Sequence, residues 1–459
     1  MSVFHNNILA GASGASGAAE PGLYADDVFS CFLYKGTDGT QTITNGIDLD
    51  GEGGMVWIQP RTIGTSSTVI DTERGSSKII HPNGNFAEET KAVVTGFNSN
   101  GFGVSSNVSG YHLLTNYLNA DYVSWAFRKA PGFFDCVTWT TTTGSAEQIA
   151  HNLGSTPGMI IVKRTDSTGS WIVWHRSLSN STTSFLRLES NVDEQNAVGV
   201  WGSNAPNSTH FEYDGGASGR TFVAYVFAHD DQSFGTDSDE AIIKCDSYTG
   251  NGSTQTINVG FEPQWVMAKR TNDSGNWNIY DIMRGMASAV DDAVVSANTF
   301  SAETATVNFL QPTATGFQIN TGNGAINNTS DTYIYVAIRR PHKPPSAATD
   351  VFAIDTSGGT SPTPPWFNSG FVTDFVLRKD VDTTGGAFTF ARLLGKRFLR
   401  TSSSAAVSDN SNYTWDFMNG FSKLTSVDTD KYGYLFRRAP GFMDVVAYNG
   451  SSSVQNIPH

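Results

Sequence analysis

A segment of eleven residues occurs twice in this chain, and this repetition limits the possible folds more than any other feature. Residues 127–137 and 436–446 are identical at eight of eleven positions and lie 309 residues apart. Four glycines before apolar strands mark further copies, at steps of 103, 106 and 110 residues: Gly51, Gly154, Gly260 and Gly370. This period predicts a tandem array of one small domain rather than a single large fold.

Each copy is predicted to be an antiparallel β-sandwich. Every repeat closes with a dense run of aromatic and β-branched residues, which is typical of a buried strand: 122–128, 222–228, 333–339 and 432–437. Short strands with turn signals every ~8–12 residues favour a sandwich. The expected fold class is all-β, with four tandem repeats in a linear array. Short helical turns are expected near residues 287–295 and 391–400.

The repeat positions define the predicted domain boundaries. They are an N-terminal peptide (1–25), repeat 1 (26–134), repeat 2 (135–232), repeat 3 (233–342), repeat 4 (343–442) and the start of a fifth repeat (443–459). Half of a strand pair cannot bury a core, so we expect the natural protein, or its ancestor, to continue past His459.

The charge balance argues against a nucleic-acid partner. The net charge is −14, from 43 acidic and 29 basic residues, and no basic run is present to bind phosphates. No apolar stretch approaches the ~18 residues of a membrane helix, so membrane insertion is not expected. The three cysteines, Cys31, Cys136 and Cys245, occupy one equivalent strand position, which predicts buried thiols and assembly in a reducing cytoplasm.

Two motifs could carry chemistry. Asp71-Thr-Glu-Arg-Gly75 and Asp281-Ile-Met-Arg-Gly285 could each form an acid–base pair or an anion site, or a local salt bridge at a turn. Repeat 2 has His175 in place of the aspartate, which favours the salt bridge. The acidic stretch 237–240 lacks the donor spacing of a calcium loop. We therefore assign no catalytic, cofactor-binding or metal residues, and predict no enzyme.

Aromatic residues suggest where a ligand could bind. Trp171 and Trp277 follow glycine-containing turns, so partial exposure is one interpretation of their position, and exposed aromatic residues are the usual platforms for sugar rings; the sequence gives this role to neither residue. The segment before the closing strand is longest in repeat 1. Because binding residues are usually carried on loops, it contains the candidate recognition loop: Tyr111, His112, Asn116 and Tyr117.

The N-terminal sequence Met1-Ser-Val-Phe-His-Asn-Asn-Ile-Leu-Ala-Gly-Ala-Ser-Gly14 resembles that of tail-fibre and tail-tip proteins of tailed bacteriophages, particularly marine and environmental ones. Residues 127–133, 152–158 and 247–252 resemble the β-modules of the same proteins. The resemblance implies an extended rod of modules, usually a symmetric oligomer and most often a trimer. It also implies an N-terminal peptide that docks on other tail proteins, with these anchoring candidates: Phe4, His5, Asn6, Asn7 and Leu9.

The resemblance favours a structural virion protein, made in the host cytoplasm and assembled into the phage tail, that mediates attachment to host-surface glycans. One alternative is a purely architectural tail or collar component that never contacts the host. Another is a tailspike-like glycan-degrading enzyme, which would need two carboxyl groups at a fixed separation across a cleft.

Overall fold

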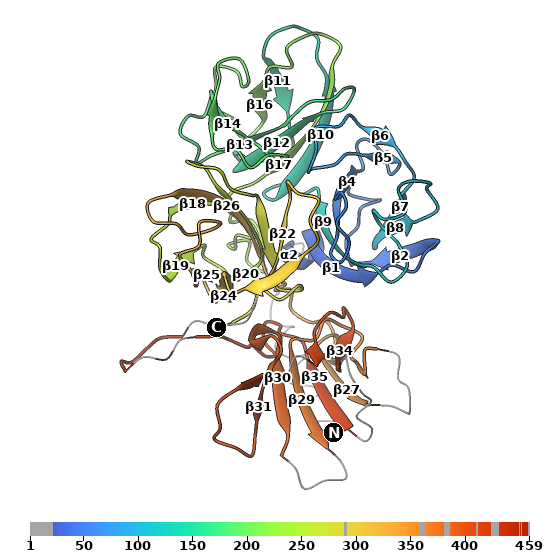
Figure 1. The fold of residues 1–459 in the computed structure, drawn as a ribbon, viewed down its shortest axis with the longest axis vertical. Coiled ribbons are helices and arrows are strands. Elements are labelled where there is room, and N and C mark those ends of the chain that lie inside the picture. The colour runs from blue at the N-terminus through green and yellow to red at the C-terminus, as the bar shows by residue number, and fades with distance from the viewer. Residues whose placement is uncertain are drawn as a thin grey trace.

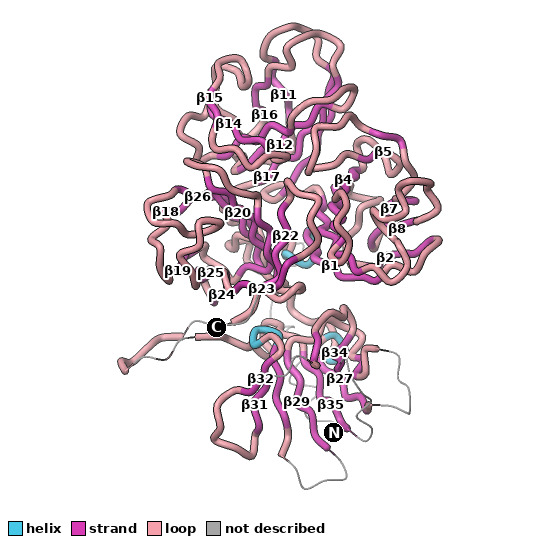
Figure 2. Tube along the Cα trace, viewed as in Figure 1, coloured by secondary structure: helices cyan, strands magenta, loops and turns pink. Residues whose placement is uncertain are grey.

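The computed structural model describes residues 22–288, 292–357, 364–380, 386–409, 412–423, 431–448, 450 and 452–457, and confirms the all-β fold. Helical turns in these residues are α2 (Ala25–Val28), η1 (Ala348–Asp350) and η2 (Arg392–Leu394), visible in Figure 2. The helical turn predicted near residues 391–400 is confirmed by η2, although the rest of that range forms the strand β31 (Arg397–Arg400). The prediction near residues 287–295 was wrong at β22 (Asp292–Ser296), which pairs as a strand at the side of a sheet. No helix in the described ranges has the length and apolarity to cross a bilayer.

Each repeat contains one larger sheet, in which the closing strand lies between the opening strand and the central strand. The strand order across the sheet of repeat 1 is β1 (Phe29–Lys35), β9 (Asp121–Arg128), β3 (Gly54–Pro60) and β4 (Thr68–Asp71), and in repeat 2 it is β10 (Phe134–Thr140), β17 (Thr221–Phe227), β12 (Met159–Arg164), β13 (Trp171–His175), β14 (Ser184–Arg187) and β15 (Gln195–Asn196). In repeat 3 the order is β18 (Ile243–Thr249), β26 (Thr332–Arg339), β20 (Pro263–Arg270), β21 (Asn278–Asp281), β22 and β23 (Thr304–Val307). In repeat 4 it is β27 (Phe352–Thr356), β35 (Lys431–Phe436), β29 (Phe375–Asp380), β30 (Phe388–Ala391), β31 and β32 (Ser408–Asp409).

A smaller second sheet lies in each repeat. In repeat 1 this sheet is β2 (Thr40–Thr44), β8 (Gly101–Ser105) and β7 (Val94–Asn98), and β5 (Lys78–Ile79) pairs separately with β6 (Glu89–Thr90). In repeat 2 it is β11 (Glu147–Ala150) and β16 (His210–Tyr213). In repeat 3 it is β19 (Gln255–Asn258), β25 (Gly316–Ile319) and β24 (Leu310–Thr313), and in repeat 4 it is β28 (Phe367–Asn368), β34 (Gly420–Lys423) and β33 (Tyr413–Thr414). In repeat 1, Val56 of the larger sheet and Phe102 of the smaller one share a core, as expected for a sandwich.

Repeats 1, 2 and 3 do not form a row; they surround a common centre (Figure 1). One hydrophobic cluster contains residues of all three larger sheets, among them Phe127, Phe227 and Ile338. Strand β3 is buried along its whole length, because the face away from its own sandwich packs against the other repeats. The expected extended rod is therefore wrong for these repeats: sheets that are apolar on both faces need a second covering layer.

The same backbone hydrogen bond recurs at each junction of this three-repeat ring. The amide nitrogen of an equivalent glutamate donates to a carbonyl of another repeat: Glu88 to Thr165 (3.0 Å), Glu194 to Thr271 (2.7 Å) and Glu303 to Arg61 (2.8 Å). The third bond joins repeat 3 back to repeat 1. The ring thus has an approximate three-fold arrangement that closes within one chain.

Repeat 4 lies to one side of the ring, below it in Figure 1. Ion pairs attach it: Arg437 to Asp26 at 2.6 Å, and Arg438 to Glu262, a buried bidentate pair with contacts of 2.7 and 2.6 Å. The recurrent segment forms the same turn after repeats 1 and 4. Gly132 and Gly441 each have a φ of 72°, in the left-handed region that glycine adopts without strain.

Candidate functional site

The Asp-x-x-Arg-Gly motif of repeat 1 lies at its junction with repeat 2. Asp71 Oδ2 accepts hydrogen bonds from Arg74 Nε (2.6 Å) and from the Tyr225 hydroxyl of repeat 2 (2.7 Å). Asp71 is fully buried. The salt-bridge interpretation is confirmed, and the third partner was missed because it comes from another repeat.

The equivalent motif of repeat 3 lies at the junction that closes the ring. Asp281 Oδ2 accepts from Arg284 Nε (2.6 Å) and from Trp125 Nε1 of repeat 1 (3.1 Å). At the remaining junction His175 replaces the aspartate, and its Nε2 donates to the backbone carbonyl of Tyr335 at 3.2 Å. These polar side chains therefore join one repeat to another and do not line an open site.

The three cysteines are confirmed as buried free thiols. Burial raises the pKa of Cys31, Cys136 and Cys245. Because a thiolate is the nucleophilic form, these side chains are unreactive where they lie. They pack in the shared centre of the ring as small apolar groups.

The structure rules out partial exposure of Trp171 and Trp277, and with it a role as sugar platforms. Both are only 1% exposed. Trp171 Nε1 donates to the carbonyls of His81 and Gly84 in repeat 1, both at 3.0 Å, and Trp277 Nε1 donates to Arg187 O in repeat 2 at 2.9 Å. Each indole is thus a contact with the preceding repeat.

The candidate recognition loop is partly exposed. The His112 and Tyr117 rings lie side by side, with centroids 5.4 Å apart, and both residues are exposed. Leu118 beside them is 52% exposed. The Tyr111 hydroxyl donates to Glu89, and Lys91 Nζ lies 4.3 Å from the ring centroid. This loop therefore offers an aromatic pair next to a polar cluster.

Asn116 corrects the prediction, because it does not belong to that exposed surface. It is fully buried; its Oδ1 accepts from the Thr37 amide at 3.0 Å, and its Nδ2 donates to Gly39 O at 3.3 Å. Asn327 makes equivalent bonds in repeat 3. Both asparagines precede a closing-strand tyrosine by six residues, a spacing that could have revealed their structural role. The anchoring candidates Phe4, His5, Asn6, Asn7 and Leu9 lie outside the described residues.

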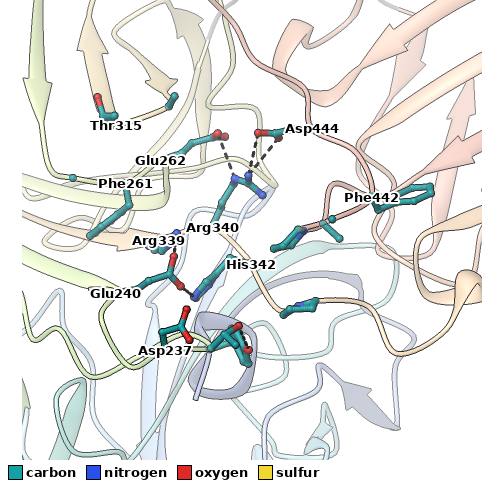
Figure 3. Close-up of a pocket in the computed structure, with 18 of the residues that line it drawn as sticks. Asp237, Glu240, Phe261, Glu262, Thr315, Arg339, Arg340, His342, Phe442 and Asp444 are labelled. Atoms are coloured by element: carbon teal, nitrogen blue, oxygen red, sulfur yellow. Dashed lines mark hydrogen bonds and ion pairs between the residues drawn. The ribbon is translucent and has the colours of Figure 1, made fainter. Parts of the chain in front are cut away.

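A cavity of about 690 Å³ lies between repeat 3 and the segment that follows repeat 4 (Figure 3). Most of its charged residues form ion pairs with one another in the cavity wall. Glu240 accepts from Arg339 at 2.7 Å and lies 3.1 Å from His342 Nε2, whereas Arg340 lies 3.4 Å from Glu262 and 3.3 Å from Asp444.

The wall of this cavity is polar and carries charged side chains. Burial, followed by the charge of Arg339, lowers the pKa of His342 to about 4, so its imidazole is neutral at pH 7. The acidic stretch of residues 237–240 contributes Asp237, Asp239 and Glu240 to the wall. Within the described ranges, no group of three or more His, Cys, Asp or Glu side chains is arranged to hold a metal ion.

Acidification is expected to destabilise the ring through His175. Burial lowers the pKa of His175 to about 3, against ~6.5 in an unfolded chain. Below pH ~6.5 the unfolded chain binds a proton that the folded chain takes up only near pH 3, so stability is lost as the pH falls through this window. Between pH 7 and pH 5, the titration of His175 lowers the free energy of unfolding by about 2 kcal/mol.

Urea unfolding at several pH values measures this loss as a falling midpoint. His175→Gln keeps a donor for Tyr335 O but does not titrate in this range. The urea midpoint of this variant should therefore fall less steeply with decreasing pH than that of the unchanged protein. Equal slopes for the two proteins would contradict the assignment.

Residues 24–341 match a family described as a domain of unknown function (DUF7483). The matched range begins at α2 and ends directly after repeat 3, so it coincides with the three-repeat ring and excludes repeat 4. No curated protein matches the chain.

Proposed function

The chain belongs to the DUF7483 family, a domain family of unknown function, and on this premise we propose that it is a structural virion protein. In this proposal it is a tail-fibre or tail-tip component of a tailed bacteriophage that attaches the virion to the host surface. The N-terminal peptide would dock on other tail proteins, and host-surface glycans are the proposed ligands. The sequence resemblance of Met1–Gly14 and of the β-modules supports the virion location.

One observation supports a binding scaffold rather than an enzyme: the chemistry-bearing side chains hold the repeats together. Asp71 and Asp281 each have their carboxylate occupied by an arginine and by a donor from another repeat. A carboxylate bound in this way has no access to a substrate. Loops on a rigid scaffold are where binding specificity is usually placed.

The exposed pair His112 and Tyr117 is the proposed contact with the host. Aromatic faces stack on the apolar faces of sugar rings, and neighbouring polar groups bind sugar hydroxyls. The low charge content of the chain, 16%, suits a neutral glycan better than an anionic polymer.

Competition for phage adsorption tests this function. Host cells are incubated with the purified chain, and the adsorption rate of the phage that encodes it is then measured. The chain is expected to slow adsorption, and His112→Ala/Tyr117→Ala should weaken this competition roughly tenfold, since two aromatic contacts contribute ~1–2 kcal/mol. The matched control Tyr448→Ala removes a tyrosine that is 65% exposed elsewhere and should compete like the unchanged chain.

The alternatives give different results. An architectural component would be present in purified virions by mass spectrometry, but its soluble form would not affect adsorption. A glycan-degrading enzyme would release reducing ends from isolated host polysaccharide. Absence of the chain from virions would refute the virion role altogether.

A further inference from the structure

The cavity between repeat 3 and the segment after repeat 4 carries more negative than positive charge (Figure 3). Its wall contains five carboxylates and two guanidinium groups, which belong to these residues: Asp237, Asp239, Glu240, Glu262, Asp444, Arg339 and Arg340. A third guanidinium comes from outside the wall, where Arg438 pairs with Glu262 and Asp444. Even with this third cation, the carboxylates outnumber the guanidinium groups.

The carboxylates without a cationic partner are those of Asp237 and Asp239. Glu240 differs from them, because it pairs with Arg339 at 2.7 Å. In the part of the chain that the structure describes, neither aspartate side chain forms an ion pair or a hydrogen bond with another residue. Both aspartates are exposed at the cavity. Their negative charge is therefore available to a ligand of opposite sign.

A buried imidazole on the same wall has an unused nitrogen atom. His342 is 5% exposed, and neither ring nitrogen makes a hydrogen bond with a described residue. Nε2 lies 3.1 Å from Glu240 Oε2, outside hydrogen-bond geometry, and Nδ1 has no polar partner. The Tyr24 ring packs edge-on against the imidazole, with centroids 5.2 Å apart, and restricts its orientation. Since buried polar atoms are normally hydrogen-bonded, this side chain points to a partner within the cavity.

Apolar side chains also line the cavity. Phe261, Phe442 and Met443 contribute to the wall, and Phe442 is 40% exposed. A volume of about 690 Å³, with apolar side chains and a few convergent polar groups, is typical of a small-ligand site. An aromatic face also attracts a cation. The wall therefore fits an aliphatic stem that ends in a positive charge.

We propose that this cavity binds an organic cation, a guanidinium group on an aliphatic stem like that of an arginine side chain. Asp237 and Asp239 neutralise its charge through charge-assisted hydrogen bonds. With its proton on Nε2, on the side of Glu240, the His342 ring presents Nδ1 as an acceptor for a third guanidinium N–H. The inference rests on the cavity alone and does not depend on the proposed virion role.

Calorimetric titration of the full chain at pH 7 tests the proposal. N-acetylarginine amide is expected to bind with a Kd of about 1 mM. N-acetylcitrulline amide has the same shape without the charge and should bind at least tenfold more weakly. Butylguanidinium lacks the peptide groups: weaker binding than the arginine amide assigns the natural ligand to a peptide, and equal binding assigns it to a free guanidinium compound.

The aspartates supply the matched variants. Asp237→Asn/Asp239→Asn should raise the Kd of the arginine amide at least tenfold. Because both residues are exposed, the thermal unfolding of this variant should match that of the unchanged protein. The control Asp50→Asn removes an exposed carboxylate of repeat 1 and should leave the Kd unchanged. In protein labelled with ¹⁵N-histidine, the Nδ1 resonance of His342, assigned by its loss in His342→Gln, should shift when the arginine amide binds.

Three results would overturn the proposal. Absence of binding at ~10 mM arginine amide would show that the cavity takes no guanidinium ligand. Equal affinity for the citrulline amide would show that the cavity does not select a positive charge. Binding that Asp237→Asn/Asp239→Asn leaves unchanged, with no shift of the His342 resonance, would place the cation elsewhere on the chain.

Discussion

Replacing Asp281 with leucine is expected to lower the free energy of unfolding of the ring by about 3–5 kcal/mol. The side chains of Asp281 and Arg284 are both 0% exposed, so the substitution leaves a buried guanidinium without its carboxylate. Glu303 lies 3.2 Å from Arg284 Nη1 but already binds Arg61 through two contacts, so it does not replace the lost partner. The indole of Trp125 also loses its acceptor.

Urea unfolding followed by tryptophan fluorescence measures this change. Asp121→Ala is the control, because it breaks the exposed Lys35–Asp121 pair and should change stability by less than ~1 kcal/mol. Asp281→Leu/Arg284→Met removes both buried charges and should recover most of the loss. If Asp281→Leu has no more effect than the control, this ion pair does not stabilise the ring.

Residues 22–341 are expected to fold as a single cooperative unit, whereas residues 22–228, which lack repeat 3, should not fold stably. Without repeat 3, Trp125, Phe127 and Tyr225 lose part of the shared core in which they are now at most 1% exposed. The expected effect is loss of the whole folding free energy, because this core is common to the three repeats rather than divided among them.

Calorimetry and far-UV circular dichroism check this prediction. The fragment 22–341 should unfold in one transition with equal calorimetric and van't Hoff enthalpies. Its midpoint should lie within a few degrees of that of the ring in the full chain, since the buried residues of the shared core all lie within residues 22–341. A fragment 22–228 that unfolds cooperatively would show that the repeats are independent domains.

The local structure could be predicted from the sequence because it depends on neighbouring residues. Dense aromatic and β-branched runs identified the closing strands β9, β17, β26 and β35. The three cysteines occupy the same strand position in their repeats, and this predicted the buried thiols. The motif Asp-x-x-Arg-Gly predicted the Asp71–Arg74 ion pair.

The ring could not be predicted in this way, because its contacts join distant residues. Arg61 and Glu303 are 242 positions apart, and nothing near either one indicates the other. Trp171 follows a turn of Gly and Ser, as an exposed residue often does, but its partner lies in repeat 1. The available signal was the continuous apolar character of strands such as β3, which a single sandwich with one solvated face does not require.

Closure of the ring within one chain has a genetic consequence. In a trimer of identical subunits, any substitution appears three times at once, so the axis must tolerate three copies of every change. Here each repeat of the ring is encoded separately, so the equivalent junction position can hold a histidine at 175 and aspartates at 71 and 281. One repeat can therefore acquire a new loop or bind a new ligand while the other two repeats keep the ring folded.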